Sequence, residues 1–187
     1  STTDQGLHIM RTSLIVTVIG PDRPGLVRLL SDCGSAHGAS WEESRMASLA
    51  GQFAGMVRFT VAKANGDALA AALAALETQG LRVVIARGDE AAPGEAKRRV
   101  LKLDLVGHDR PGIVRDISRV LAENGVSIDE LHTEVVSGAM SGGDLFRIAA
   151  RLAVPDSIGI DALRQLLEGV GNELMVDITL GESNAPA

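Results

Sequence analysis

The sequence predicts an α+β protein of two similar domains, each an antiparallel sheet with both helices on one face. The first observation behind this prediction is a repeat. Gly-Pro-Asp-Arg-Pro-Gly-Leu-Val-Arg begins at Gly20, and Gly-His-Asp-Arg-Pro-Gly-Ile-Val-Arg begins at Gly107. The second is that the hydrophobic patterns around both copies follow one order: strand, helix, strand, strand, helix, strand. With 187 residues, 45% of them hydrophobic, the chain can build two small cores.

The first domain is expected over residues 1–90, with its core at 10–88 and a flexible lead at 1–9. Gly38 and Gly80 are expected to end its two helices, because glycine adopts the left-handed conformation that closes a helix. We predict these elements: strand 14–19, helix 26–37, strand 39–49, strand 53–62, helix 68–79 and strand 81–85.

The second domain is expected over residues 98–187, with its core at 98–181, after a linker at 91–97. The linker is predicted because residues 88–95 are polar, contain Gly and Pro, and lack any hydrophobic period. The connection between its middle strands is longer than in the first domain. We predict these elements: strand 100–106, helix 113–124, strand 126–136, strand 144–154, a helix that starts at 155–157 and stops at Gly171, and strand 173–180.

Each copy of the repeat joins a strand to a helix, and its residue types indicate a binding loop. Pro24 suits the first helical position, Asp22 stands where a helix cap is wanted, and Gly20 permits a turn. Gly25, expected inside the first turn, leaves backbone amides bare, so the loop is predicted to cradle an anion or a carboxylate. The alternative is that Asp only caps the helix, Arg faces solvent, and Pro and Gly shape the turn. The candidate binding residues are Gly20, Asp22, Arg23, Gly25 and Leu26, with Gly107, His108, Asp109, Arg110, Gly112 and Ile113 in the second copy.

Composition limits the classes of function. A net charge of −6 opposes direct binding to a phosphate backbone, and 2% aromatic residues leave little material for stacking on bases. No apolar run approaches the roughly 20 residues that span a bilayer, so no membrane association is expected. A single cysteine, Cys33, excludes an internal disulfide and fits a cytoplasmic location.

The β-α-β-β-α-β order is that of the ferredoxin-like fold, and with the repeated phrase it resembles the ACT domain, in two tandem copies. Asp-Arg-Pro-Gly after a strand that ends in Gly is typical of one ACT subgroup. That subgroup includes the glycine cleavage system transcriptional repressors and the formyltetrahydrofolate deformylases. Further stretches resemble the repressors: Ser44-Arg45-Met46-Ala47, Phe53-Ala54-Gly55-Met56, Val126-Ser127-Ile128-Asp129-Glu130-Leu131 and Ala139-Met140-Ser141-Gly142.

The resemblance implies a regulatory protein that binds a small amino acid, with glycine as the suspected effector. It also implies transcriptional regulation through a protein partner such as an activator of glycine cleavage, without direct nucleic acid binding, and a possible homodimer. By resemblance to ACT effector sites, Ser40 and Trp41, with Ser127 and Ile128, would complete a pocket beside the loop. The alternative is a detached regulatory subunit of an amino-acid or folate enzyme.

No catalysis, cofactor or metal is expected. The sequence has no Gly-Lys-Ser/Thr phosphate loop, no Cys-x-x-Cys pair and no Gly-x-Ser-x-Gly elbow. Glu130, His132 and Glu134 alternate along one strand, a spacing that metal ligands can use, but a polar strand face is the favoured interpretation. The face of each sheet opposite its helices is predicted to pair with another surface, since the strands are rich in Leu and Val.

The charge balance generates a first testable prediction. At physiological salt, the purified chain is expected to leave a candidate operator fragment unshifted in a mobility assay, because its net charge of −6 opposes binding to the phosphate backbone. A sequence-specific shift without a partner protein would contradict it.

Overall fold

The computed structural model describes residues 10–88, 98–138, 140 and 142–182. The chain divides into two compact units, residues 1–93 and 94–187. The predicted flexible lead at 1–9 and the predicted linker at 91–97 lie outside the described residues.

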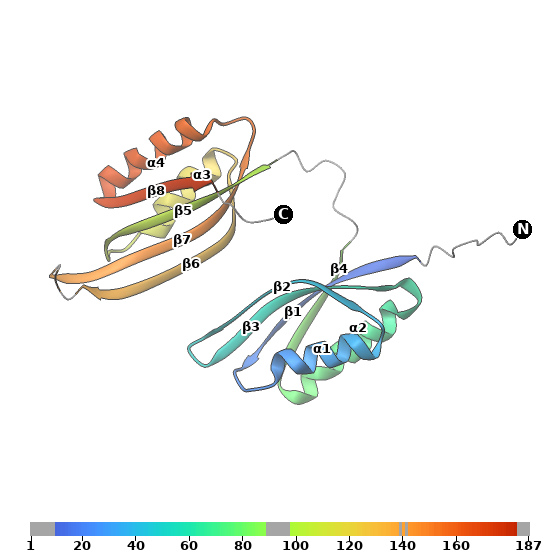
Figure 1. Ribbon diagram of the computed structural model, residues 1–187. Coiled ribbons are helices and arrows are strands. Elements are labelled where there is room, and N and C mark those ends of the chain that lie inside the picture. The colour runs from blue at the N-terminus through green and yellow to red at the C-terminus, as the bar shows by residue number, and fades with distance from the viewer. Residues whose placement is uncertain (1–9, 89–97, 139, 141, 183–187) are drawn as a thin grey trace, which may run out of the picture. The chain divides into compact units, whose positions relative to one another are not determined.

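The first unit is a four-stranded antiparallel sheet in the order β2-β3-β1-β4, with both helices on one face (Figure 1). Two short 3-10 segments, η1 (Lys63–Asn65) and η2 (Ala75–Gln79), flank its second helix. The main elements are β1 (Arg11–Pro21), α1 (Leu26–Ala36), β2 (Ser40–Leu49), β3 (Gln52–Ala62), α2 (Gly66–Ala74) and β4 (Arg82–Gly88).

The second unit repeats this topology, with the strand order β6-β7-β5-β8. Its elements are β5 (Arg98–His108), α3 (Ile113–Glu123), β6 (Ser127–Gly138), β7 (Gly143–Pro155), α4 (Ile160–Leu174) and β8 (Val176–Glu182). Two ferredoxin-like α+β domains confirm the predicted fold class.

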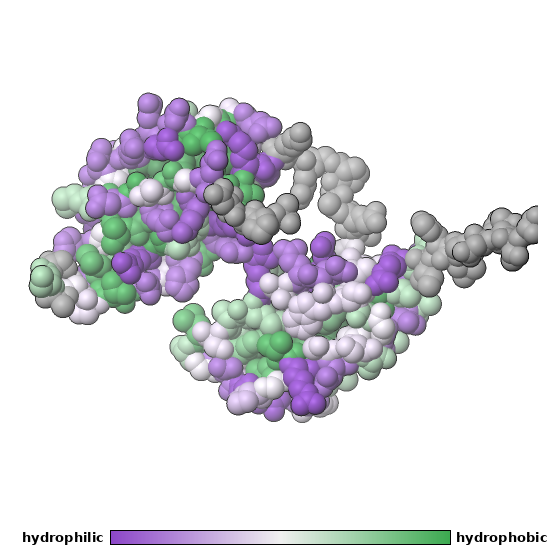
Figure 2. All heavy atoms as spheres, in the orientation of Figure 1, coloured by the Kyte–Doolittle hydropathy of each residue, from purple (hydrophilic) through white to green (hydrophobic). Residues whose placement is uncertain are grey.

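Alternation along the central strand places each core between sheet and helices. In β1, the side chains of Leu14, Val16 and Val18 are fully buried, and their neighbours along the strand point to the opposite face. In α1, the buried residues Leu26 and Leu30 recur one turn apart, as expected for a helix with one apolar face. Apolar residues also reach the visible surface of both units, between charged ones (Figure 2).

One predicted helix changes type before it reaches its predicted end at Gly80, and another runs past its predicted end at Gly171. The helix expected over 68–79 ends at Ala74 and continues as the 3-10 segment η2, which Gly80 closes with a φ of 86°. In the second domain Gly171 does not stop the helix, because α4 runs on to Leu174 and Met175 takes the left-handed position with a φ of 53°. Gly171 instead lets β8 approach, since a Cβ there would stand 3.0 Å from the Val176 carbonyl oxygen.

A β-bulge interrupts the second strand of both domains at the same position. The register shifts between Trp41 and Glu43 in β2, and between Ile128 and Glu130 in β6. The extra residue reverses the alternation, so that Trp41 faces the helices while Glu43 faces the other side of the sheet.

The two cores fill one position with different pairs of residues. In the first domain Phe59 packs on Gly34, and Trp41 meets the Phe59 ring edge-on with centroids 5.4 Å apart. In the second domain Leu121 and Leu152 stand at the positions of Gly34 and Phe59, as matching backbone bonds and strand registers show. The small residue and the large ring are therefore a matched pair.

We expect Gly34→Ala to lower the free energy of unfolding of the first domain by about 1–3 kcal/mol, because overpacking displaces the Phe59 ring. A Cβ at Gly34 would stand 2.5 Å from Phe59 Cε1. Urea unfolding followed by the fluorescence of Trp41, the single tryptophan, reports this domain alone.

The control is Gly169→Ala in α4, where nothing lies within 4 Å of the new Cβ and no loss is expected. Because α4 belongs to the second domain, the unfolding of this variant is followed by circular dichroism. Phe59→Leu should cost less in the Gly34→Ala background than alone, since the leucine makes room for the methyl group. An unchanged unfolding midpoint for Gly34→Ala would contradict this packing account.

Candidate functional site

The strand-to-helix loop of each domain presents unpaired backbone amides at the start of a helix. Gly25 is the N-cap of α1 with a φ of 93°, and Gly112 is the N-cap of α3 with a φ of 94°. The first amides bonded within the helices are those of Leu29 and Asp116, which donate to Gly25 and Gly112 at 2.9 Å. The three amides before each of them have no acceptor inside the helix, so they point outward as donors.

The predicted capping roles in this loop are wrong. Neither helix has a side-chain cap, so Asp22 and Asp109 do not cap. Pro24 is not the first helical residue, because Gly25 follows it as the N-cap and the helix begins at Leu26. The cause is the left-handed conformation of Gly25, which turns the chain into the helix without a capping side chain.

The loop is held from both sides by bonds that recur in the two domains. On one side, the amides of Asp22 and Asp109 donate to carbonyl oxygens of the neighbouring hairpin, Gly51 O at 2.9 Å and Asp144 O at 3.0 Å. On the other side, Arg23 Nη2 donates to Gln79 O at 2.5 Å.

Arg110 makes the matching bond in the second domain, from Nη2 to Glu173 O at 3.4 Å. Gln79 ends the 3-10 segment η2 that continues α2, and Glu173 lies in the last turn of α4. At both ends carbonyl groups lack helical partners and a cation is favoured. The alternative in which the loop arginines only face solvent is therefore wrong. Arg23 and Arg110 position the loop.

Four candidate residues serve the core or the sheet, two through buried side chains and two glycines through the lack of one. Leu26 and Ile113 are 3% and 2% exposed, so only their backbone can face a ligand. A Cβ at Gly20 would stand 2.6 Å from Gly80 O, and one at Gly107 would collide with the Val176 side chain. These two glycines let the neighbouring edge strand approach, which differs from the turn role predicted for them.

Ser40, Trp41, Ser127 and Ile128 do not lie beside the loop. Ser40 pairs with Thr60 of β3, which lies opposite Ser13 near the start of β1. The loop follows Pro21, which pairs with Gln52 at the other end of the sheet. The reason is topological, because α1 carries the chain back along the sheet before β2 begins. Their own contacts are local: Arg11 Nη2 donates to Ser40 Oγ at 3.3 Å, and Arg98 Nη1 to Ser127 Oγ at 2.8 Å.

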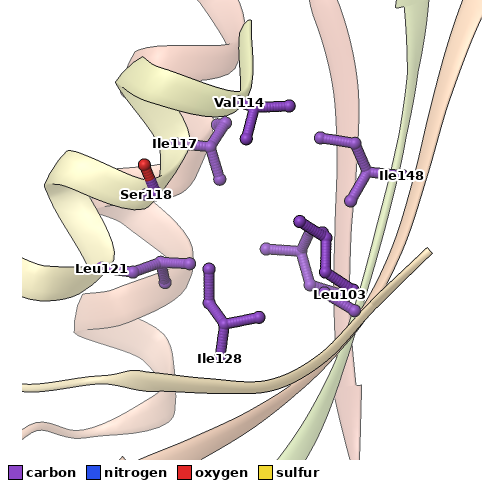
Figure 3. Close-up of a pocket in the computed structure, with 9 residues that line it drawn as sticks. Leu103, Val114, Ile117, Ser118, Leu121, Ile128 and Ile148 are labelled. Carbon is purple, nitrogen blue, oxygen red and sulfur yellow. The ribbon is translucent and has the colours of Figure 1, made fainter. Parts of the chain in front are cut away.

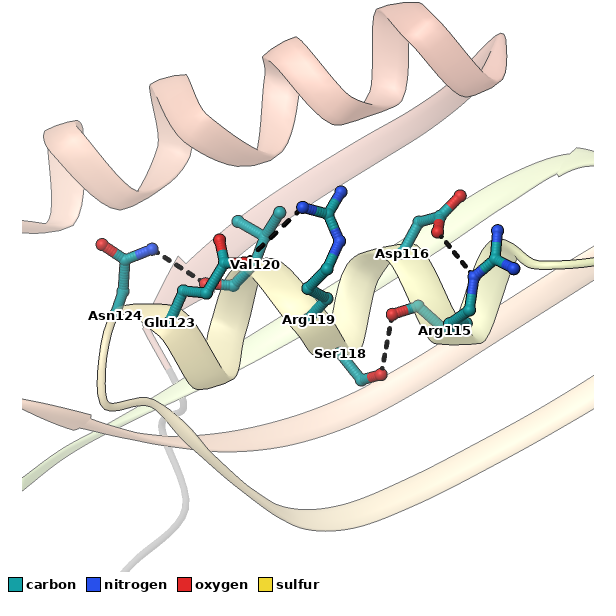
Figure 4. A network of polar contacts seen from close by, with 7 residues as sticks. All are labelled: Arg115, Asp116, Ser118, Arg119, Val120, Glu123 and Asn124. Atoms are coloured by element: carbon teal, nitrogen blue, oxygen red, sulfur yellow. Dashed lines mark hydrogen bonds and ion pairs between the residues drawn. The ribbon is translucent and has the colours of Figure 1, made fainter.

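The loop of the second domain carries an additional charged cluster on α3 (Figure 4). Arg115 Nε donates to Asp116 Oδ1 at 2.9 Å, and Arg119 pairs with Glu123 one turn further on. The bond from Arg115 lowers the pKa of the Asp116 carboxyl, with the charges of Arg119 and Arg110 acting in the same direction. The first domain has the apolar Leu29 in this first turn, so the two helix starts differ in charge.

The other polar candidates are exposed. His108 is the exposed last residue of β5. Glu130 and Glu134 lie 3.7 Å from arginines on β7, Arg151 and Arg147. The residues that the structure describes contain no cluster of three or more metal-ligating side chains.

A small apolar pocket lies between α3 and β6, where Ile128 stands in place of the larger Trp41 (Figure 3). Ser118 supplies the single hydroxyl group of its lining, so the pocket has nothing to recognise a charged ligand. It is lined by Leu103, Val114, Ile117, Ser118, Leu121, Ile128, Leu131, Ile148 and Ala150.

Comparisons with known families match both domains. Residues 12–85 match one family profile of the ACT domain, and residues 101–172 match another. No helix among the described residues is long and apolar enough to cross a membrane.

Three relatives illustrate the likeness. The UPF0237 protein MK1213 of Methanopyrus kandleri is 35% identical over 75 residues, which are 40% of this chain and 77% of the relative. An unknown protein of Galdieria sulphuraria has a crystal structure with a TM-score of 0.82 at 33% identity, over 93% of this chain and 99% of its own. A protein provisionally described as a glycine cleavage system transcriptional repressor gives a TM-score of 0.67 at 18% identity, over 92% and 97%, which is a likeness of fold.

The charged cluster on α3 generates a pH prediction. The folded pKa of Asp116 lies below its ordinary value of 3.8, so its ion pair stabilises the domain fully above that value. This contribution is lost as the pH falls through the folded pKa. Asp116→Asn should therefore destabilise the second domain at pH 7, and the difference from the wild type should shrink as the pH falls below 3.8, as measured by urea unfolding with circular dichroism.

The exposed bulge residue Asp129 offers the control variant, Asp129→Asn. A carboxyl carbon titration by nuclear magnetic resonance gives the folded pKa of Asp116 directly. A value at or above 3.8 would contradict the assignment of the ion pair.

Proposed function

The chain belongs to the ACT-domain family, with two ACT domains in tandem, and from this premise we propose that it senses a small amino acid at its strand-to-helix loops. ACT domains are regulatory modules that bind small amino-acid effectors. One observation supports the loops as the sites: unpaired amides follow a left-handed glycine at the same place in both domains.

The chemistry of the loop suits an amino acid with little or no side chain. The outward amides of Leu26, Val27 and Arg28 donate hydrogen bonds to the effector carboxylate, and the helix dipole favours its negative charge. The exposed carboxylate of Asp22 meets the ammonium group. In the second domain, the three amides that follow Gly112 and the carboxylate of Asp109 play these parts.

We propose glycine as the effector and a transcriptional activator of glycine cleavage as the partner that receives the signal. The proposal rests on the sequence resemblance to the glycine cleavage repressors. One structural neighbour bears the name of such a repressor, a name that refers to the neighbour itself and is consistent with this proposal. A net charge of −6 favours indirect repression through a protein over contact with DNA.

Thermal unfolding in the presence of amino acids and folates tests the proposal, because a ligand that binds the native state raises the apparent stability. Glycine should raise the unfolding temperature, whereas acetate and methylamine, which each carry half of its charges, should not. A response to folates with none to amino acids would support a regulatory subunit of folate metabolism and overturn the glycine proposal.

We expect Asp22→Asn and Asp109→Asn together to weaken glycine binding about ten- to a hundredfold in calorimetry, through loss of a charge-assisted hydrogen bond. Asp32→Asn, further along α1 and outside the loop, should leave the affinity unchanged. An unaltered affinity in the loop variants would leave Asp22 and Asp109 with no part in binding.

Valine at Gly25 or at Gly112 should each abolish binding at its own loop, and the double variant should abolish it altogether. These variants also strain the backbone, since both glycines have a φ above 90°. Their unfolding temperatures must therefore be compared with that of the wild type. Wild-type affinity in both glycine variants would contradict the proposal that the loop amides bind the effector carboxylate.

A further inference from the structure

The two sheets share one fold and one register, yet their open faces differ in chemistry. We define the open face of sheet 1 as the side of β1–β4 opposite α1 and α2. Strand pairing aligns a row of side chains across it: Met56 on β3 pairs with Thr17 on β1, and Thr17 pairs with Val84 on β4. The next row runs from Ala54 through Ile19 to Arg82.

Large apolar side chains on this face are exposed to an unusual degree. Val84 is 68% exposed, Met56 50% and Ile19 46%. Ala54 and Ala86 pair with Ile19 and Ile15 of β1, whereas Arg45 and Arg82 stand at the ends of the two rows. A contiguous apolar patch of this kind marks an interaction surface in a soluble protein.

The corresponding face of sheet 2 is suited to water. At the registers of Ile15 and Thr17 it carries Lys102 and Asp104, which pair at 3.6 Å. Glu134 and Arg147 stand at the positions of Ala47 and Ala54, and they pair at 3.7 Å. Since the same scaffold tolerates a charged face in one domain, the fold itself does not require the apolar face in the other.

The charged residues of the open face of sheet 1 are mostly cationic. Arg45 and Arg58 both meet Glu43, at 2.7 and 3.8 Å, beside a depression whose floor includes Ile15 and Met56. Arg82 lies beyond Ile19 in its row, where sheet 2 has Asp177, a charge of the opposite sign.

The excess of arginine on this face contrasts with the net charge of −6 of the whole chain. A second copy of the same face would bring arginine against arginine, so this composition disfavours self-association. It favours a partner with carboxylates.

We propose that the open face of sheet 1 docks an amphipathic helix of a protein partner, with an apolar stripe on the exposed row and carboxylates beside the arginines. A helix is the fitting element because α1 and α2 already pack on the other face of this sheet. The inference rests on the proposed function only in that a sensor needs a partner to receive its signal.

The test uses a labelled helical peptide of about 18 residues, or five turns, with a leucine stripe flanked by glutamates. A matched peptide carries lysine in place of glutamate. Fluorescence anisotropy should show that the full chain binds the glutamate peptide at least about tenfold more tightly than the lysine peptide.

Two variants place on sheet 1 the residues that sheet 2 carries at the same register, Thr17→Asp and Arg82→Asp. Each variant should weaken the binding of the glutamate peptide about tenfold or more and strengthen the binding of the lysine peptide. The reason is that an added aspartate places a negative charge on the apolar face and reduces its net positive charge. The matched control is Asp104→Thr on sheet 2, which should change neither affinity.

Equal binding of the two peptides, or an unchanged affinity in Thr17→Asp, would overturn the proposal. So would a wild-type dimer in sedimentation that Thr17→Asp dissociates, since a second copy would then cover the face. Glycine binding is measured on the same variants and should be unaffected. Its absence in every variant, with peptide binding intact, would count against the proposed sensor alone.

Discussion

The register of the central strand is the constraint on which each domain depends. β1 pairs with β3 along its whole length and with β4 from Ser13 to Ile19, and in this register Leu14, Val16 and Val18 all point to the helices. A slip of one residue would turn them to the opposite face and expose the core. The same register brings Gly20 against the start of β4 and delivers the loop to the end of the second helix.

The two domains keep the parts that shape the loop and vary the surfaces around it. Both retain the left-handed glycine, the hairpin contact and the arginine bond to the last turn of the second helix. They differ in the first helical turn, where Leu29 corresponds to Asp116, and on the open face of the sheet. A shared loop with different surroundings is what the proposed sensor requires if both loops bind the effector and only one sheet docks a partner.

The order of the elements could be predicted because alternating and helical hydrophobic patterns depend on local sequence alone. The roles of Asp22 and Pro24 could not, since the φ of Gly25 decides where the helix begins. Ser40 lies far from the loop because α1 carries the chain back along the sheet before β2 begins. The predicted order of strands alone does not give this position. The one sequence signal for the bonds of Arg23 and Arg110 is that each arginine follows an aspartate at the same place in the repeat.

The paired residues in the two cores bear on how such copies persist within one chain. A side chain at position 34 would collide with the Phe59 ring, whereas the second domain has Leu121 and Leu152 at the two matching positions. An exchange of genetic material between the two halves that moved one helix without its facing strand would join residues that cannot pack. Recombination between the halves therefore carries a penalty in stability, and each domain remains free to diverge from the other.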